Sequence, residues 1–420
     1  MYLYQSNRLE NLFSALCATL AEPIANPLAP EVIVVQNPGM SRWLSQQIAL
    51  RTGISAHLSF PLPATFVWNI FEQTLGILPD LSQFDRNVLL WRIQQELTLL
   101  LTDPSMREIN AYLQDDFVGS KKFQLAEKIT DIFDQYLVYR SEMLLEWEKG
   151  EVAEGKGGEN LWQAKLWQQL TNKNKNHRAA LMRQFIQIAR AGMLRADTLP
   201  QRVSIFGINS LAPAYLEVID QISRHIDIHI FHLSPCRQAW DDILPERLLA
   251  IKRQSWRDQG IDDVSEYFTA GNPLLASMGT VGQEFFSQLM QLNPIDTDLY
   301  EEPVASRPLS TLGAIQWDIL DLRDRSYLGD QENCSQQQNT QILFGDNSIR
   351  FHCCHSSMRE IQVLHDRLLD LFTADPELNP TDILVMAPDI SLYAPAVGGV
   401  FGSAPTDLRI PWSIADRSVQ

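Results

Sequence analysis

The chain of 420 residues has few cysteines, no long apolar run and a shortage of positive charge. Its five cysteines are an odd number without C-x-x-C spacing, which argues against a disulfide framework and against a cysteine zinc site. No uninterrupted apolar stretch approaches the roughly 18 residues that a membrane helix needs, and the first residues lack the basic and apolar regions of a signal peptide. We therefore predict a cytoplasmic protein without a membrane partner.

The shortage of positive charge restricts any contact with nucleic acid. Lys and Arg number 34 against 51 Asp and Glu, so the net charge is −17. Nonspecific affinity for nucleic acid comes from neutralising phosphates, so such contact must be local. One exception runs from Gln163 to Ala196, which contains no acidic residue and is called the basic stretch below. Two interpretations remain open, a solvated helix face and a phosphate-tracking surface. Its cations are Lys165, Lys173, Lys175, Arg178, Arg183, Arg190 and Arg195.

A third shortage concerns nucleotide binding. The stretch VIVVQNPGMSRWL, residues 32–44, begins like a P-loop, with an apolar run typical of a buried strand, a Pro-Gly turn and a helix opened by Ser41. It lacks the second glycine and the lysine that would hold phosphates. Residues 203–211 supply Phe206, Gly207 and Asn209 where an ATPase strand delivers acidic residues to magnesium. We predict that neither strand end binds ATP or Mg²⁺, so the chain itself has no cofactor.

Two groups of histidines could be mistaken for metal ligands. His225, His229 and His232 lie in a stretch whose isoleucines alternate, and this pattern predicts a strand that spreads the imidazoles along its length. The sequence HCCH at residues 352–355 is also strand-like, so its adjacent cysteines would point to opposite faces. We predict no metal site and, because no paired catalytic carboxylates or nucleophile motifs occur, no catalytic residue.

The periodicity of the chain predicts an α/β protein with a long helical insertion. A helix is expected from Asn7 to Leu20, and another begins near Ala64. From about residue 80 to 196 the pattern is helical, most clearly in FQLAEKITDIFDQYLVYR. At Arg202 the period changes, and the sequence predicts a strand, a helix and a second strand. These pieces indicate one parallel-sheet domain interrupted by all-helical sequence.

A second break follows the predicted sheet domain. The stretch GDQENCSQQQNTQ, residues 329–341, is polar and patternless, as in a linker. We predict that the linker covers residues 331–347. The stretches IRFHCCHS and DILVMAPD are then predicted as strands on either side of a helix, MREIQVLHDRLLDLF. One such unit is too small to close a sheet that is buried on both faces. We therefore expect the chain to end inside a second domain.

Six quoted motifs resemble one family. YQSNRLENL, VVQNPGMSRWL, FPLPATFVW, DIFDQYLVYR, GNPLLASMG and VFGSAPTD are similar, in order from Met1 to the last residues, to the amino-terminal part of the RecC family. These proteins are the gamma chains of bacterial exodeoxyribonuclease V, the RecBCD complex. Family members are far longer than this chain.

The resemblance implies a degenerate superfamily 1 helicase-like fold that has lost its ATP site. Residues 1–75 and 201–330 would form an inactive RecA-like domain with a parallel sheet. Residues 76–200 would be its large all-helical insertion, residues 331–347 a linker, and residues 348–420 the start of a second RecA-like domain. The predicted lack of a nucleotide site, which comes from the residues themselves, agrees with this implication.

The resemblance also implies a role in DNA repair by homologous recombination. A RecC subunit binds the RecB and RecD motor subunits, which use ATP and Mg²⁺, guides single strands of forked DNA and scans one strand for the Chi hotspot. Such readers stack bases on aromatic rings and hydrogen-bond base edges with polar side chains. Pro38 and Arg42 depart from the family pattern of smaller or uncharged polar residues. Seven residues match the family's DNA-reading positions by motif, and we add the cations Arg42 and Lys175. The predicted DNA-binding residues are therefore Gln36, Arg42, Leu62, Trp68, Asp131, Asp134, Arg140, Lys175 and Arg178.

Other functions stay open on the sequence alone. The chain could be an active helicase or nuclease, which the two degraded motifs oppose. It could be a scaffold that binds partner subunits without touching DNA, which the charge of −17 allows. It could also be an AddB-type helicase-nuclease subunit, although that relative's iron-sulfur cysteines do not match this chain. For Trp68, packing in the core is an alternative to base stacking.

Overall fold

The centre of the protein is one parallel sheet. The computed structural model describes residues 1–76, 83–116, 118–151, 161–258, 271–302, 310–324 and 345–414. In this part of the chain six strands are joined in the order β3-β2-β4-β5-β1-β6, and every neighbouring pair is parallel. The α/β prediction is thus confirmed. The strands are β1 (Tyr2–Ser6), β2 (Glu31–Val35), β3 (Leu58–Ser59), β4 (Arg202–Phe206), β5 (Asp227–Leu233) and β6 (Ile295–Asp298).

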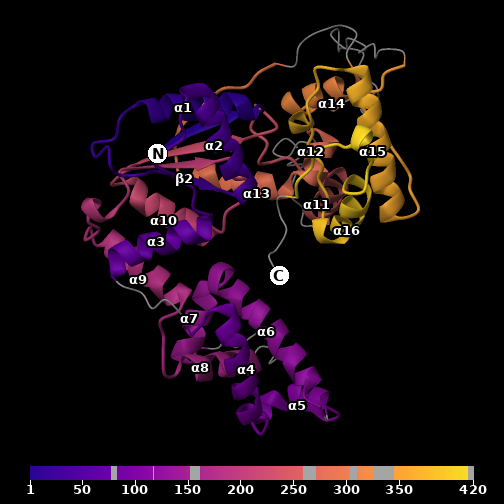
Figure 1. Ribbon diagram of the computed structural model, residues 1–420. Coiled ribbons are helices and arrows are strands. Elements are labelled where there is room, and N and C mark those ends of the chain that lie inside the picture. The colour runs from indigo at the N-terminus through magenta and orange to yellow at the C-terminus, as the bar shows by residue number, and fades with distance from the viewer. Residues whose placement is uncertain are drawn as a thin grey trace.

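Both faces of the sheet are buried, as is usual for parallel strands joined by helices. Val34, Ile205 and Ile230 point to one face and pack against α3 and α10. Their neighbours Ile33 and Phe231 point to the other face, which α1 and α2 cover. Figure 1 shows these two helical layers on opposite sides of the strands. The helices are α1 (Leu9–Ala21), α2 (Pro38–Thr52), α3 (Pro63–Leu75) and α10 (Pro213–Ser223).

The predicted helical insertion has a core of its own. Trp167 is fully buried at its centre, with the rings of Phe84 and Phe133 at centroid distances of 5.5 and 5.4 Å. This helical part lies below the sheet in Figure 1. Its helices are α4 (Arg86–Leu100), α5 (Arg107–Leu113), α6 (Ser120–Tyr139), α7 (Ser141–Lys149) and α8 (Leu161–Thr171).

Helix α9 (Arg178–Arg190) joins the two cores. Ala179, in its first turn, packs with the helical part. Leu181, Phe185 and Ile186 pack instead beneath the sheet with α3 and α10. The last helix of the predicted insertion therefore contributes most of its apolar side chains to the sheet core.

The remaining helices lie beside the sheet and form two smaller cores. Trp240, almost fully buried, centres one of them with Phe286. The other joins α15 and α16 around Ile361 and Phe401. Residues 331–344 of the predicted linker lie outside the described residues. The helices are α11 (Glu246–Asp258), α12 (Pro273–Met278), α13 (Thr280–Gln291), α14 (Thr311–Leu320), α15 (Ser357–Ala374) and α16 (Ile390–Phe401).

Two predicted strands are wrong. The predicted helix between them is confirmed as α15, but residues 349–356 and 382–389 form no strand in the described part of the chain. A strand needs a neighbour with which to share backbone hydrogen bonds, and no described segment pairs with these residues. Their apolar side chains are accordingly exposed, 91% for Phe351 and 83% for Met386.

Three strands and one helix start were missed. Strand β1 has too few residues before its helix to show a period, β3 has only two residues, and β6 reads IDTD, which is polar and exposed throughout. Helix α2 begins at Pro38 rather than at Ser41. The reason is that the Asn37 side chain caps the helix by accepting a hydrogen bond from the backbone N–H of Met40, and Pro38 suits the first helical position.

Acidification will destabilise the fold through His232. This side chain is 2% exposed, contacts the rings of Phe285 and Phe286, and has no hydrogen-bond partner among the described residues, and burial lowers its pKa from 6.5 to about 4. The unfolded chain binds the proton near pH 6.5 and the folded chain only near pH 4. The free energy of unfolding should fall by about 3 kcal/mol across that window from this group alone.

Urea unfolding across the same pH window tests this prediction. The variant His232→Leu should lose about 3 kcal/mol less stability on acidification than the parent. The control His225→Leu alters an exposed imidazole and should keep the parent's pH dependence. If the free energy of unfolding falls equally with pH in His232→Leu and in the parent, the prediction is contradicted.

Candidate nucleic-acid interface

The order of the strands gives the sheet two switch points. At β1 the chain leaves towards β2 on one side, and it later passes from β5 to β6 on the other side of β1. Between β2 and β4 the chain passes from β2 to β3 on one side and from β4 to β5 on the other. In open α/β sheets, ligands bind outside the carboxyl ends of the strands at such a reversal. The topology therefore indicates two positions for a nucleotide, the end of β1 after Ser6 and the loop after β2 that the sequence pattern also indicates.

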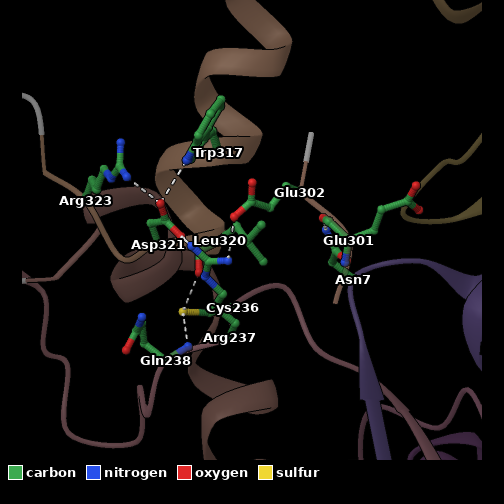
Figure 2. Close-up of polar contacts among 10 residues, drawn as sticks. All are labelled: Asn7, Cys236, Arg237, Gln238, Glu301, Glu302, Trp317, Leu320, Asp321 and Arg323. Carbon is green, nitrogen blue, oxygen red and sulfur yellow. Dashed lines mark hydrogen bonds and ion pairs between the residues drawn. The ribbon is translucent and has the colours of Figure 1, made fainter. Parts of the chain in front are cut away.

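The chain's own residues 299–302 close the switch point at β1. The Ser6 hydroxyl donates a hydrogen bond of 2.8 Å to the carbonyl oxygen of Leu299. Asn7 and Glu301 face each other in Figure 2, where the Asn7 amide donates to the Glu301 carbonyl at 2.9 Å and accepts from its N–H at 3.0 Å. The Asn11 amide donates to Leu299 as well, at 3.1 Å. Polar groups that could meet a ligand at the end of β1 are thus bonded within the chain.

The end of α14 is fixed to the same region. The Cys236 thiol contacts the carbonyl oxygen of Leu320 at 3.4 Å, and burial raises the pKa of this thiol. The Asp321 carboxylate accepts from the indole of Trp317 at 2.8 Å and pairs with Arg237 at 2.7 Å, as Figure 2 shows. A hydrogen bond with Glu302 helps to raise the pKa of the Arg237 guanidinium. These contacts hold residues 234–238, 299–302 and 317–323 together.

The loop after β2 also has little capacity for phosphate. A helix start binds anions through free backbone N–H groups. Here the N–H of Met40 is bonded to the Asn37 side chain at 2.9 Å, that of Ser41 to the Asn37 carbonyl at 3.4 Å, and Pro38 has none. Gly207, with φ of +63°, lets the chain turn after β4 close to the start of α2. A Cβ at this position would lie 3.4 Å from the Met40 side chain.

The carboxyl edge of β2 and β3 brings two predicted DNA-binding residues together. The backbone N–H of Val35 donates to the carbonyl of Pro61 at 3.1 Å, so Gln36 and Leu62 follow from neighbouring chain ends. Both side chains are exposed. Arg42, in the first turns of α2, is exposed and has no ion-pair partner among the described residues.

A pocket of about 290 Å³ contains two more of the predicted residues, Trp68 and Arg178. It lies where α3 and α10 of the sheet part meet α6, α7 and α9. Its walls are mostly apolar, and a few polar groups point into it, as is typical of ligand sites. The other lining residues are Ala64, Thr65, Val67, Phe71, Asp85, Leu137, Val138, Ser141, Met182, Ala214 and Tyr215.

The remaining predicted residues on α6 lie around this pocket rather than in its lining. Asp134 forms an ion pair of 3.1 Å with Arg178, which links α6 to α9. Asp131 pairs with Arg86 at 2.8 Å. The exposed guanidinium of Arg140 lies 5.5 Å from the ring centroid of Tyr136. Two of the three charges are therefore already paired within the protein.

Most of the basic stretch is neutralised by acidic residues from other elements. Arg183 pairs with Glu142 at 2.9 Å and Arg190 with Glu217 at 3.0 Å. Lys165 and Arg195 are paired with Asp103 and Asp197, and Arg178 with Asp134. Only Lys173 and Lys175, both exposed before α9, have no acidic partner in the described part of the chain. The surface that could track phosphates is thus much smaller than the sequence suggested.

The sequence reasoning missed the other lining residues, among them Asp85, Met182 and Tyr215. Asp85 precedes α4, Met182 lies on α9, and Tyr215 lies in the first turn of α10. No periodicity distinguishes them from ordinary helical residues. Only Tyr215 had a weak signal. It comes shortly after the predicted strand that ends before Asn209, and a parallel sheet brings the loops after its strands to one edge.

The amino-terminal domain of RecC matches residues 1–322 of this chain. The chain belongs to the RecC N-terminal domain family. It is 38% identical to the RecBCD enzyme subunit RecC of Escherichia coli (strain K12), over 99% of this chain and 39% of the relative. The corresponding RecC subunit of Haemophilus influenzae is 33% identical over 99% of this chain and 41% of the relative. The chain thus spans about two fifths of the length of these RecC relatives, and the family prediction is confirmed.

Two further properties of this RecC-family chain concern metals and membranes. Within the described ranges, no group of three or more His, Cys, Asp or Glu side chains could hold a metal ion. None of the helices in those ranges is both long and apolar enough to span a membrane.

Removing the His177 side chain will destabilise the start of α9. This imidazole is fully buried, its Nδ1 accepts from the N–H of Ala180 at 3.3 Å, and its Nε2 lies 2.5 Å from the Glu148 carboxylate. His177→Ala leaves the N–H of Ala180 without its cap and the Glu148 carboxylate with only the 3.3 Å hydrogen bond from the Trp167 indole, which should lower the free energy of unfolding by about 3 kcal/mol. Urea unfolding measures the loss. The exposed neighbour Lys175→Ala should change stability by less than about 0.5 kcal/mol, and an equally small effect of His177→Ala would refute the role.

Proposed function

We propose that this chain is the amino-terminal part of a noncatalytic RecC subunit of exodeoxyribonuclease V, acting in double-strand break repair by homologous recombination. It binds and channels single-stranded DNA, contributes to recognition of Chi and scaffolds the RecB and RecD motor subunits on forked DNA. Membership of the RecC family supports the assignment, because the relatives from Escherichia coli and Haemophilus influenzae are described as "RecBCD enzyme subunit RecC".

The fold is consistent with a helicase-like ancestry. The parallel sheet with helices on both faces is proposed as an inactive RecA-like domain of residues 1–75 and 201–330, interrupted by the helical insertion 76–200. Residues 331–347 are the proposed linker, and residues from 348 begin a second RecA-like domain. The packing of α9 against the sheet supports a boundary nearer to Arg178 than to residue 200.

The pocket between the sheet and the helical part is the observation that carries the DNA-binding proposal. Trp68 offers a ring on which an unpaired base can stack, and Arg178 offers hydrogen-bond donors to a base edge. Exposed Gln36 and Leu62 lie at the adjoining carboxyl edge, at the start of the helix that carries Trp68. We propose that the DNA strand passes along this edge of the sheet into the pocket. Asp131, Asp134 and Arg140 lie beyond the pocket on this path.

Two observations support a noncatalytic role for this part of the protein. The switch point at β1 is closed by residues 299–302, and the N–H groups of Met40 and Ser41 at the start of α2 are bonded to Asn37. Met40 stands where a phosphate-binding lysine would be expected. We therefore propose that ATP and Mg²⁺ are used by the partner subunits.

Replacing Trp68 or Arg178 should separate DNA reading from DNA unwinding. In the complete RecBCD-type complex, Trp68→Ala and Arg178→Gln are expected to keep unwinding and to lose the cleavage response to Chi. The loss of one stacked base corresponds to about 1–3 kcal/mol, or roughly five- to 150-fold in affinity for single-stranded DNA. Unwinding assays and cleavage patterns on Chi-containing duplexes provide the two readouts.

Two matched variants control for the substitutions themselves. Trp91→Ala removes a 62% exposed indole outside the pocket, and Arg195→Gln removes an exposed guanidinium that already pairs with Asp197. Both should behave like the parent. If Trp68→Ala leaves the Chi response intact, the reading role fails. If it also abolishes unwinding while the milder Trp68→Phe restores it, Trp68 is a packing residue and the scaffold interpretation gains.

Neutralising the two unpaired lysines should weaken DNA binding in a salt-dependent manner. Lys173→Ala with Lys175→Ala removes the cations of the basic stretch that have no acidic partner among the described residues. If both contact phosphates, the slope of log affinity against log salt should decrease by about 1.4, the value expected for two contacts with single-stranded DNA. The paired arginines Arg190 and Arg195 serve as the control double substitution to Ala. An unchanged slope for the lysine variant would remove this surface from the DNA path.

A further inference from the structure

The pocket contains polar side chains that form no hydrogen bond with any described residue, namely Thr65, Ser141 and Tyr215. Tyr215 enters from α10, on the sheet side, and lines the pocket together with Trp68 and Arg178. Burial raises the pKa of the Tyr215 phenol, and the charge of the Arg178 guanidinium lowers it. Among the residues that the structure describes, none forms a hydrogen bond with this hydroxyl.

The other charged groups of the pocket are already engaged. Arg178 is held by Asp134 at 3.1 Å, and Asp85 also interacts within the protein. A phenol hydroxyl can both donate and accept, whereas the guanidinium only donates. Tyr215 can therefore form a new hydrogen bond with either kind of group on a ligand without first breaking one inside the protein, and its side chain is longer than those of Thr65 and Ser141, the other lining hydroxyls.

The shape and chemistry of the walls favour a nucleobase over a phosphate. Most lining side chains are apolar, including Val67, Leu137 and Met182, and an anion would lose its hydration there with only the already paired Arg178 to compensate. A flat base instead buries its faces against apolar groups and presents polar atoms only at its edge. The volume of about 290 Å³ is at the lower end of the ~300–1,000 Å³ that ligand sites occupy.

We propose that Tyr215 is a specificity-determining residue of this pocket, whose hydroxyl forms a hydrogen bond with the edge of an unpaired nucleobase stacked at Trp68. The inference rests on the proposed function and deepens it, because it assigns part of the base selection to the sheet side of the pocket. Trp68 supplies affinity for any base, since every base has a face to stack. Tyr215 then distinguishes one base edge from another by the direction of its hydrogen bond.

The variant Tyr215→Phe tests this role because it removes only the hydroxyl. The complete complex is titrated with equal-length oligonucleotides of dA, dC, dT and abasic residues, and fluorescence anisotropy gives each affinity. Tyr215→Phe should reduce the ratio between the most and least favoured base roughly fivefold, the contribution of one hydrogen bond. Its affinity for the abasic oligonucleotide should equal that of the parent.

Tyr139→Phe is the matched control. Tyr139 is 68% exposed at the end of α6, lies near the same charges and does not line the pocket, so its variant should keep the parent's base ratio. An unchanged base ratio in Tyr215→Phe, or an equal change in Tyr139→Phe, would overturn the role of Tyr215. An equal loss for bases and abasic residues would show a structural effect and overturn it too.

A third variant separates this inference from the proposal on which it rests. If Trp68→Ala lowers affinity for base-containing oligonucleotides but Tyr215→Phe changes nothing, the pocket binds bases and only the role of Tyr215 is wrong. If Trp68→Ala leaves the preference for bases over abasic residues intact, the pocket holds no base and both proposals fail.

Discussion

Parallel pairing of the strands is the constraint on which the rest of the structure depends. Parallel strands must be joined by crossovers, so helices cover both faces and the carboxyl ends of all strands meet at one edge. In this protein that edge has two halves. Around β1 it is closed by residues 299–302, whereas at β2 and β3 it is open and continues into α3 and the pocket. The same rule that builds the sheet therefore decides where a ligand can approach it.

The sequence predicts the fold best where the physical signal is local. The buried runs that became β2 and β4, and the helix that follows β4, were all identified because apolar period is a property of a few adjacent residues. Strand β1 was missed because its stability comes from β5 and β6, which lie far along the chain. Residues 349–356 have a strand-like pattern and form no strand, because pattern alone supplies no pairing partner.

The candidate site shows the same division between local and tertiary information. Trp68 and Arg178 were singled out through family resemblance and residue type, and the structure brings them into one pocket. The electrostatics could not be anticipated, since a stretch without any acidic residue receives its acids from α6, α7 and α10. Asp134, Glu142 and Glu217 become neighbours of α9 only on folding. Charge counted along a sequence is therefore a poor measure of the charge that a folded surface presents.

The central place of β1 has a consequence for the order of events during synthesis. Tyr2 pairs with His229 and Ile295, so β1 must wait for its partners until the ribosome has produced the whole helical part and β5. The helical part can consolidate earlier, because its core draws only on residues between Phe84 and Ala179. Contacts of long sequence separation form late, since closing a long loop costs entropy before any contact repays it. The helical part can thus consolidate before the sheet that precedes and follows it in the sequence.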